Sequence, residues 1–238
     1  MIKVATFDVD GTLMRRYEDV YTLKIEAIDH AVRQTYGLGE FRYHNYLKPS
    51  MYGMTDRSIL RHLLLMVGID ESELDSKFEK LFQNIFTYFD SHPEHTTDKD
   101  YYLLPGVVEI LKLLKSRNIA MGLATGNYLR FTEWKVGGLG LWDYFTFGGY
   151  GNDADDRADI VGVALNRSGG ESGHAIHFGD TVADIEAAHA NNMLAGVVTS
   201  KGGAIFDSAM LKDAGADLII DSWQDTESIM RFLENHSG

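Results

Sequence analysis

The chain has 238 residues, of which 22 are Lys or Arg and 35 are Asp or Glu, so its formal net charge at pH 7 is −13. This excess of negative charge argues against a nucleic-acid partner or an anionic membrane surface. Hydrophobic residues make up 45% and charged residues 24%, which is typical of a globular protein and excludes disordered and collagen-like classes. Because the sequence contains no cysteine, its chemistry must come from carboxylates, hydroxyls, Lys and His.

Targeting signals are not evident in the sequence. The N-terminal segment turns acidic at Asp8, too early for the apolar region of a secretory signal. A run of about 18 apolar residues, the length that a membrane helix needs, occurs nowhere. These features predict a soluble, cytoplasmic protein without a membrane partner, and they leave the oligomeric state open.

The predicted elements begin with a buried strand at residues 2–7, a short run of mostly apolar and β-branched residues. From about Leu103 onward, strand and helix patterns alternate to the end of the chain. This βαβ alternation predicts an α/β fold with a doubly wound parallel sheet and right-handed crossovers. The further predicted elements are helix 107–115, strand 119–124, helix 128–136, strand 144–147, helix 157–166, strand 175–178, helix 182–190, strand 194–198, helix 205–213, strand 217–220 and helix 226–233.

Residues 20–90 break this alternation, because their apolar residues recur at helical spacing without strands between them. We predict a smaller, inserted helical cap domain at residues 16–99 and an α/β core domain at residues 1–15 and 100–238. The polar stretches 14–19 and 91–99 are the expected hinges. The aromatic residues of the cap are expected to form its core rather than a specificity pocket, namely Tyr43, Tyr46, Phe78, Phe82, Phe86, Tyr88 and Phe89.

The segment Asp8-Val9-Asp10-Gly11-Thr12 follows the first predicted strand, at the edge where open parallel sheets bind ligands. Carboxylates two residues apart on an extended chain point to the same side, where their repulsion is costly without a cation or a shared proton. Mg²⁺ is suited to this position, because it prefers oxygen ligands and shares them with phosphates. The alternative is a β-turn in which Asp and Gly have no further role.

Two more strand ends carry polar residues. Thr125, Gly126 and Asn127 follow the strand at 119–124, where a hydroxyl and free backbone N–H groups can hold phosphate oxygens, although Thr125 or Asn127 could instead cap the next helix. Asp180 and Asp184 follow the strand at 175–178 and could face one site, although Asp184 is also a favourable acid in the first turn of a helix. We expect the neighbouring His174 and His177 to pack or to contact solvent.

All three strand ends would meet at one edge of one sheet, and chance placement of three such groups is much less probable than chance placement of one. In this combination the chain resembles the haloacid dehalogenase-like (HAD) hydrolase superfamily. Its DxDGT motif, its Thr at the second strand end and its GDxxxD motif match in order and spacing over nearly the whole chain. Leu104-Pro105-Gly106-Val107, Phe147-Gly148-Gly149 and Gly53-Met54-Thr55-Asp56 further resemble the phosphoglycolate phosphatase and β-phosphoglucomutase-like branch with a helical cap.

The resemblance implies a Mg²⁺-dependent phosphatase that hydrolyses a small phosphorylated metabolite through an aspartyl-phosphate. Asp8 would be the nucleophile, and Asp10 would be the general acid and base. Asp8, the backbone carbonyl of Asp10 and Asp180 would hold Mg²⁺, with Asp184 as a further ligand or as a group that orients the others.

Further roles follow from the same resemblance. Thr125, Gly126 and Asn127 would bind the transferring phosphoryl group. The cation that the family places beside the nucleophile would be Lys135, with Arg157 as the alternative and an exposed helical Lys as the simpler interpretation of Lys135. The candidates for substrate recognition by the cap are Gly53, Thr55, Asp56 and Arg57, of which Arg57 could equally be a solvated helix residue.

Two alternatives remain open at this stage. A phosphomutase of the β-phosphoglucomutase type would share the core residues, and Arg57 near Gly53 is compatible with one. A non-catalytic phosphate-binding relative would be indicated by the loss of Asp8, Asp10 or Asp180, but all are present. The resemblance disfavours dehalogenation and phosphonate cleavage, since neither normally has an Asp two residues after the nucleophile.

Overall fold

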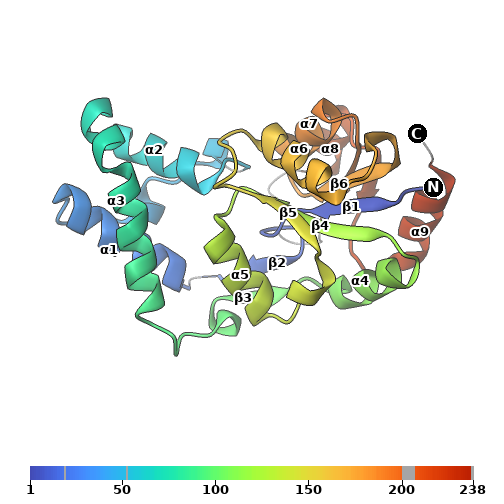
Figure 1. Cartoon of the computed structure of the whole chain (residues 1–238), viewed down its shortest axis with the longest axis horizontal. Helices are drawn as coiled ribbons and strands as arrows, with labels where there is room; N and C mark the ends of the chain where they lie inside the picture. Colours follow the sequence, from blue (N-terminus) through green and yellow to red (C-terminus); the bar gives the residue numbers. More distant parts are fainter. Residues whose placement is uncertain (19, 52, 200–206, 237–238) are drawn as a thin grey trace.

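A computed structural model describes residues 1–18, 20–51, 53–199 and 207–236. Within these residues a six-stranded parallel sheet has the order β5-β4-β1-β6-β7-β8, and helices cover both of its faces (Figure 1). The α/β, doubly wound architecture predicted from the sequence is therefore confirmed. The strands are β1 (Val4–Phe7), β4 (Ala120–Thr125), β5 (Phe147–Tyr150), β6 (Ala175–Gly179), β7 (Leu194–Val198) and β8 (Leu218–Ile220).

Strand β1 lies in the middle of the sheet, and its four residues are all buried. Successive side chains of a strand point to opposite faces, so Phe7 packs in one apolar layer and Val4 in the other. Burial on both faces explains why β1 is a continuous apolar run rather than an alternating one. The helices over the Phe7 face are α4 (Val107–Ser116), α5 (Leu129–Gly138) and α9 (Thr226–Asn235), and those over the Val4 face are α6 (Arg157–Ser168), α7 (Val182–Ala190) and α8 (Ser208–Asp213).

Two predicted elements differ from those observed. Residues 142–144 form a 3-10 helix, and the strand predicted at 144–147 is instead β5 at Phe147–Tyr150. The sequence is misleading here because Gly148 and Gly149 do not resemble strand residues, although Gly149 is needed for close packing: a Cβ there would lie 2.2 Å from the backbone oxygen of Ile160 in α6. The helix predicted at 205–213 begins at Ser208, and residues 205 and 206 lie outside the described residues.

The insertion predicted from the sequence consists of helices α1 (Leu23–Tyr36), α2 (Asp56–Met66) and α3 (Glu71–Asp90). These helices enclose an apolar cluster of their own, which also receives Phe131 of α5. The predicted aromatic residues pack in or against this cluster, as expected, although Tyr43 also lines the main cavity. The 3-10 helices are η1 (Tyr43–Asn45), η2 (Pro49–Met51), η3 (Thr97–Lys99), η4 (Trp142–Tyr144) and η5 (Ser172–His174).

A short antiparallel ribbon connects the insertion to the core. Residues 14–19 are predicted above as a hinge, but Met14–Arg16 form strand β2, which pairs with β3 (Tyr101–Leu103). Strand β2 is absent from the sequence-based prediction because so short a strand shows no periodicity and its partner lies on the far side of the insertion in the sequence. The hinge itself stays a prediction. The division into domains at residues 16 and 99 stays a prediction.

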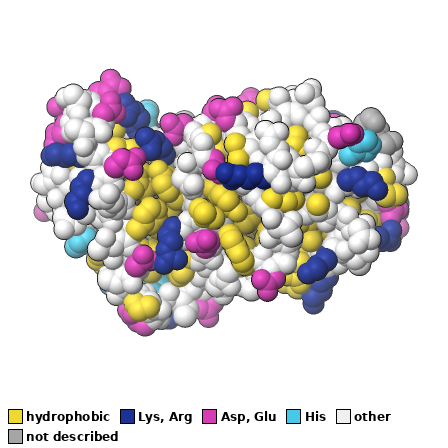
Figure 2. All heavy atoms as spheres, viewed as in Figure 1, with side chains coloured by type: hydrophobic (Ala, Val, Ile, Leu, Met, Phe, Trp, Pro, Cys, Tyr) yellow, Lys and Arg dark blue, Asp and Glu magenta, His cyan; other side chains and the backbone are white. Residues whose placement is uncertain are grey.

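Hydrophobic side chains, unlike charged ones, are unevenly distributed on the face shown in Figure 2. Acidic and basic side chains are interspersed over this face, and hydrophobic side chains gather where the insertion meets the core. None of the helices in the described ranges is both long and apolar enough to cross a membrane.

Candidate active site

Three neighbouring strands bring the predicted site residues together. Asp8 directly follows β1, Thr125 is the last residue of β4, and Asp180 directly follows β6. Since β1 pairs with both β4 and β6 in parallel, these three carboxyl ends lie side by side. All three residues line one cavity of about 480 Å³ between the sheet and the insertion. The convergence that the sequence predicts is therefore present.

The loop after β1 is held tightly against the loop after β6. The Asp8 backbone N–H donates to the carbonyl of Phe178 at 2.8 Å, which extends the sheet by one residue. Gly11 adopts a φ of +83°, and a Cβ at this position would lie 2.0 Å from Oδ2 of Asp180. Glycine is required for both reasons, the left-handed backbone and the close approach. The loop is therefore a turn, as the alternative interpretation predicts, but its residues also line the cavity.

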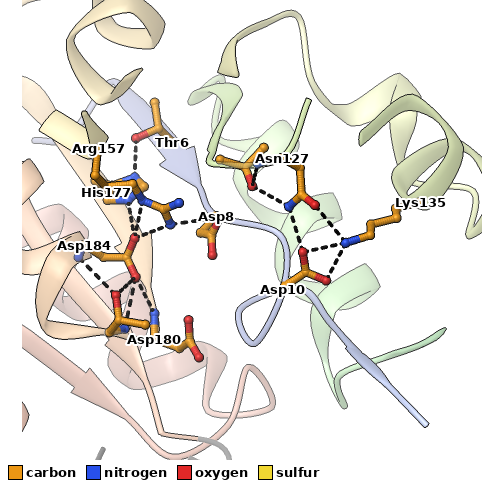
Figure 3. Close-up of polar contacts among 11 residues, drawn as sticks. Thr6, Asp8, Asp10, Asn127, Lys135, Arg157, His177, Asp180 and Asp184 are labelled. Atoms are coloured by element: carbon orange, nitrogen blue, oxygen red, sulfur yellow. Dashed lines mark hydrogen bonds and ion pairs between the residues drawn. The ribbon is translucent and has the colours of Figure 1, made fainter. Parts of the chain in front are cut away.

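An acidic cluster forms one side of the site (Figure 3). Carboxylate oxygens of Asp8, Asp180 and Asp184 all lie within 4.8 Å of one another. Arg157, the first residue of α6, reaches into this cluster, with Nη2 at 2.9 Å from Oδ1 of Asp8 and Nε at 3.0 Å from Oδ1 of Asp184. Among the residues that the structure describes, Arg157 is therefore the cation that forms an ion pair with the predicted nucleophile.

Within this cluster Asp184 is fully hydrogen-bonded. Its Oδ2 accepts hydrogen bonds from the Thr181 hydroxyl at 2.7 Å and from the backbone N–H groups of Thr181 and Asp180 at 3.0 and 3.1 Å. Burial by itself raises the pKa of Asp184, but Arg157 and hydrogen bonds from His177 and Thr181 outweigh it and hold the pKa below its ordinary value. Asp184 also completes a capping box with Thr181 at the start of α7, so it is suited to orient Asp180.

The negative charges of the other two carboxylates are compensated less completely. Burial, followed by the negative charges of Asp184 and Asp8, raises the pKa of Asp180 well above 3.8. Burial also raises the pKa of Asp8, with Arg157 opposing the shift and Asp184 adding to it. A hard divalent cation between Asp8 and Asp180 would relieve this repulsion, and carboxylate oxygens are the ligands that Mg²⁺ prefers. The donor set therefore fits Mg²⁺.

A second polar cluster lies across the cavity from the acidic one (Figure 3). Lys135 Nζ contacts both carboxylate oxygens of Asp10, at 2.8 and 2.6 Å, and donates to Oδ1 of Asn127 at 2.9 Å. Asn127 in turn donates from Nδ2 to Oδ2 of Asp10 at 2.7 Å. The Asp10 carboxylate thus faces Lys135 and is not part of the acidic cluster, so only its backbone carbonyl remains a candidate metal ligand.

The exposure of Lys135 decides between its two interpretations. Only 2% of the residue is exposed, although it lies on the helix α5, and its Nζ lies 4.8 Å from the centre of the Tyr101 ring. Burial raises the pKa of Asp10, but the charges of Lys135 and Lys24 outweigh it, and the pKa falls below 3.8. Lys135 is therefore a buried partner of Asp10 rather than an exposed helical Lys.

Lys24 was not identified as a site residue from the sequence. Its Nζ lies 2.6 Å from Oδ1 of Asp56 and 2.8 Å from Oδ1 of Asn127, so it joins the insertion to the core. Asp56 strengthens this connection, since its backbone N–H donates to the carbonyl of Gly126 at 2.9 Å. The sequence contains one signal for this role. Lys24 lies between Leu23 and Ile25, on the apolar side of a helix, where a charged residue is unusual.

The predicted cap residues divide into two pairs. Gly53 and Asp56 line the cavity. Thr55 instead caps α2, where its hydroxyl accepts a hydrogen bond from the Ser58 backbone N–H at 3.1 Å. Arg57 is not among the cavity-lining residues, and its side chain lies 3.6 Å from Glu79 and 3.2 Å from Asp155 in ion pairs. The structure therefore does not bring Thr55 or Arg57 into the site.

The segment after β4 does not serve as a helix cap. Tyr128 is the N-cap of α5 and provides no side-chain hydrogen bond there. The Thr125 hydroxyl is buried and accepts from Nδ2 of Asn127 at 2.9 Å, and Thr125, Gly126 and Asn127 all line the cavity. The interpretation that Thr125 or Asn127 only caps the next helix is wrong, because helix α5 begins at Leu129, one residue later than predicted, and Tyr128 is its N-cap.

His177 packs in the interior, as expected, but it also supports the acidic cluster. Its Nδ1 lies 2.9 Å from the Thr6 hydroxyl, and its Nε2 lies 3.4 Å from Oδ1 of Asp184. The pairing of β1 with β6 places Thr6 opposite His177. No local pattern predicts this contact, since it depends on two strands that are distant in the sequence.

Comparison with known proteins agrees with this geometry. Residues 2–192 match the family described as haloacid dehalogenase-like hydrolase. The chain belongs to this HAD-like hydrolase family. No curated protein sequence gives a significant match.

Solved structures share the fold over almost the full length of the HAD-like chain. A β-phosphoglucomutase from Clostridium difficile has a TM-score of 0.70 at 20% identity and covers 98% of each chain. CbbY from Rhodobacter sphaeroides, in complex with phosphate, has a TM-score of 0.68 at 19% identity over 94% of this chain and 95% of its own. A predicted phosphoglycolate phosphatase from Haemophilus somnus has a TM-score of 0.67 at 18% identity over 96% and 98%. At such identities the likeness shows the fold alone.

Proposed function

We propose that this HAD-like protein is a Mg²⁺-dependent phosphatase that hydrolyses a small phosphorylated metabolite. The observation that carries the proposal is the position of Asp8 between the other two members of the acidic cluster, Asp180 and Asp184, and the second cluster, which contains Asp10 and Lys135 (Figure 3). A nucleophile in this position has a metal-binding group on one side and an acid–base group on the other.

Two steps follow from this arrangement. In the first, a carboxylate oxygen of Asp8 bonds to phosphorus while the bond from phosphorus to the ester oxygen breaks, and Asp10 donates a proton to the leaving oxygen. Asp10 has to take up this proton from solvent before the step, because Lys135 holds its carboxylate ionised in the free site. In the second, Asp10 takes a proton from water, whose oxygen bonds to phosphorus and releases Asp8 and inorganic phosphate. Dividing the displacement in this way lets one carboxylate serve first as acid and then as base.

The remaining residues bind and orient. The Thr125 hydroxyl and the backbone N–H groups of Gly126 and Asn127 are proposed to hold the transferring phosphoryl oxygens, while Lys135 and Arg157 supply positive charge around them. Asp8, Asp180 and the Asp10 carbonyl are the proposed Mg²⁺ ligands, with Asp184 orienting Asp180. When bound, Mg²⁺ supplies the charge that lets an anionic carboxylate approach an anionic phosphate.

The position of Arg57 bears on the phosphomutase alternative. A mutase must bind a sugar that already carries a second phosphate, and Arg57 is the cation of the insertion that the sequence offers for that purpose, since Lys24 is already paired with Asp56. Arg57 is instead paired with Glu79 and Asp155, and it packs against the ring of Phe78. The arrangement therefore favours transfer of the phosphoryl group to water.

Phosphate release tests the proposal. The protein is incubated with Mg²⁺ and a panel of phosphoesters that includes phosphoglycolate, sugar phosphates and nucleotides. We expect release from at least one ester, and we expect Asp8→Asn, with an unchanged circular dichroism spectrum, to lose more than 99% of it because the amide is a poor nucleophile. An Asp8→Asn variant that retains more than a few per cent of the activity would contradict the assignment of the nucleophile.

A further inference from the structure

The cavity has two chemically different walls. The wall formed by the α/β core is polar, and it carries the carboxylates, Thr125, Asn127 and the cations described above. The wall formed by the insertion is lined mostly by apolar and aromatic side chains. These are Ile25, Tyr43, Leu47, Met51, Met54 and Ile59.

The charged residues of the insertion wall are already engaged. Lys24 and Asp56 are paired with each other at 2.6 Å, and each also bonds to the core, through Asn127 and the Tyr128 backbone N–H. Both are at least 90% buried. These contacts use two of the three N–H donors of Lys24, so the pair offers a polar ligand few further hydrogen bonds.

Two arginines of strand β2, Arg15 and Arg16, also line the cavity. The charge of Arg15 opposes, without outweighing, the rise in the pKa of Asp180 that burial and the neighbouring acids cause. Arg16 donates to the carbonyl of Val20 at 3.0 Å. Lys135 and Arg157 thus place positive charge on the core side of the cavity, whereas Lys24 on the insertion side is paired with Asp56.

From this division we infer that the substrate is a phosphomonoester whose alcohol is largely apolar, rather than a polyhydroxylated sugar phosphate. The inference rests on the proposed phosphatase function and specifies its substrate class. An apolar alcohol gains free energy by leaving water for the insertion wall, whereas sugar hydroxyls would lose hydrogen bonds to water and find few replacements among its apolar side chains. A cavity of about 480 Å³ is large enough for a small ligand.

A matched pair of esters tests the inference. Hexyl phosphate and sorbitol 6-phosphate are both six-carbon phosphates of a primary alcohol, and they differ in the hydroxyl groups. The hydroxyls make sorbitol the better leaving group, so intrinsic reactivity opposes the expected preference. We expect kcat/KM for hexyl phosphate to exceed that for sorbitol 6-phosphate at least tenfold.

The outcomes separate the inference from the function on which it rests. Equal values, or a preference for sorbitol 6-phosphate, would overturn the inference and leave the phosphatase intact. No release from either ester, or from the wider panel, above the Asp8→Asn background would overturn the proposed function, and the inference with it.

Substitutions in the wall provide a second test. Ile59 lines the cavity from helix α2, whereas Leu65 on the same helix is 40% exposed and outside the cavity. Ile59→Ala is expected to raise KM for hexyl phosphate about tenfold and to leave KM for sorbitol 6-phosphate unchanged, since it removes apolar contact. Leu65→Ala is the matched control and should change neither value.

A third variant shows whether the effect of Ile59→Ala comes from a disturbed helix α2 rather than from lost apolar contact. Met54→Ala alters the same wall from the loop before α2. Equal losses for both esters in Ile59→Ala and Met54→Ala would show that the wall does not select for apolar groups, and the inference would be wrong.

Discussion

Asp180 and Asp184 lie four positions apart in the sequence, and their surroundings shift their pKa values in opposite directions. The Asp184 carboxylate accepts several hydrogen bonds and pairs with Arg157, which lowers its pKa. The Asp180 carboxylate receives no hydrogen bond from the described residues, and burial beside two other acids raises its pKa. Such an uncompensated acid destabilises the folded state above its ordinary pKa of 3.8, as expected of a group retained for function.

The two Asp→Asn variants should therefore shift stability in opposite directions. In EDTA at pH 7, Asp180→Asn is expected to raise Tm by about 2–4 °C, because a neutral amide removes about 1 kcal/mol of charge repulsion. Asp184→Asn is expected to lower Tm by about 10 °C, since it leaves Arg157 with a weaker partner at a cost of about 3 kcal/mol. Thermal unfolding followed by circular dichroism measures both. A fall in Tm for Asp180→Asn as large as that for Asp184→Asn would contradict this account.

At the scale of elements, the contact between β5 and α6 positions Arg157. Helix α6 crosses strands β5, β4 and β1, and its first residue, Arg157, thereby reaches Asp8. The helix can approach this closely because Gly149 has no side chain: a Cβ there would lie 2.2 Å from the Ile160 carbonyl oxygen. Backbone atoms cannot move aside as a flexible side chain can, so the separation between strand and helix depends on this glycine.

A pair of glycine variants tests this dependence. Gly149→Ala is expected to lower the free energy of unfolding by about 1–3 kcal/mol and to reduce activity, because α6 must move outward and carry Arg157 with it. Gly137→Ala in helix α5, where a Cβ meets nothing within 4 Å, is expected to raise stability by about 0.5–1 kcal/mol. Urea unfolding measures both free energies. A Gly149→Ala variant as stable as the wild type would show that the strand and the helix can separate without cost.

In the molecule as a whole, the site lies where three separately packed apolar clusters meet the cavity between the insertion and the core. One fills the insertion, and others fill the two faces of the sheet. Lys24 and Asp56 connect the insertion to the segment after β4 directly at the cavity. Ligand binding at this position should therefore stabilise both parts together.

Removal of the metal tests this expectation. EDTA should abolish phosphatase activity, and excess Mg²⁺ should restore it. Mg²⁺ at a hundred times its Kd should stabilise the fold by about 2.7 kcal/mol, which corresponds to a rise in Tm of about 5–10 °C. Asp180→Asn should lose this rise, whereas Asp143→Asn, at an exposed carboxylate in η4 outside the cavity, should keep it. Full activity in the presence of chelator would contradict the metal assignment.

Much of the fold follows from local patterns in the sequence. Helix α7 and strand β7 have the predicted bounds, because an apolar strand and a capped helix are encoded by neighbouring residues. Strand β2 could not be predicted, since it depends on a partner that is distant in the sequence. The position of strand β5 could not be predicted either, because its glycines are needed for close packing against helix α6 and not for strand formation.

For the site, the sequence by itself determined which strand ends carry Asp8, Thr125 and Asp180, because parallel strands place their carboxyl ends at one edge. Only the tertiary structure decided that Lys135 faces Asp10 and Arg157 faces Asp8. It also decided that Lys24 enters the site and Arg57 does not. The physical reason is that a long, charged side chain pairs with whichever opposite charge the packing of helices brings within reach, and that packing is not a local property of the sequence.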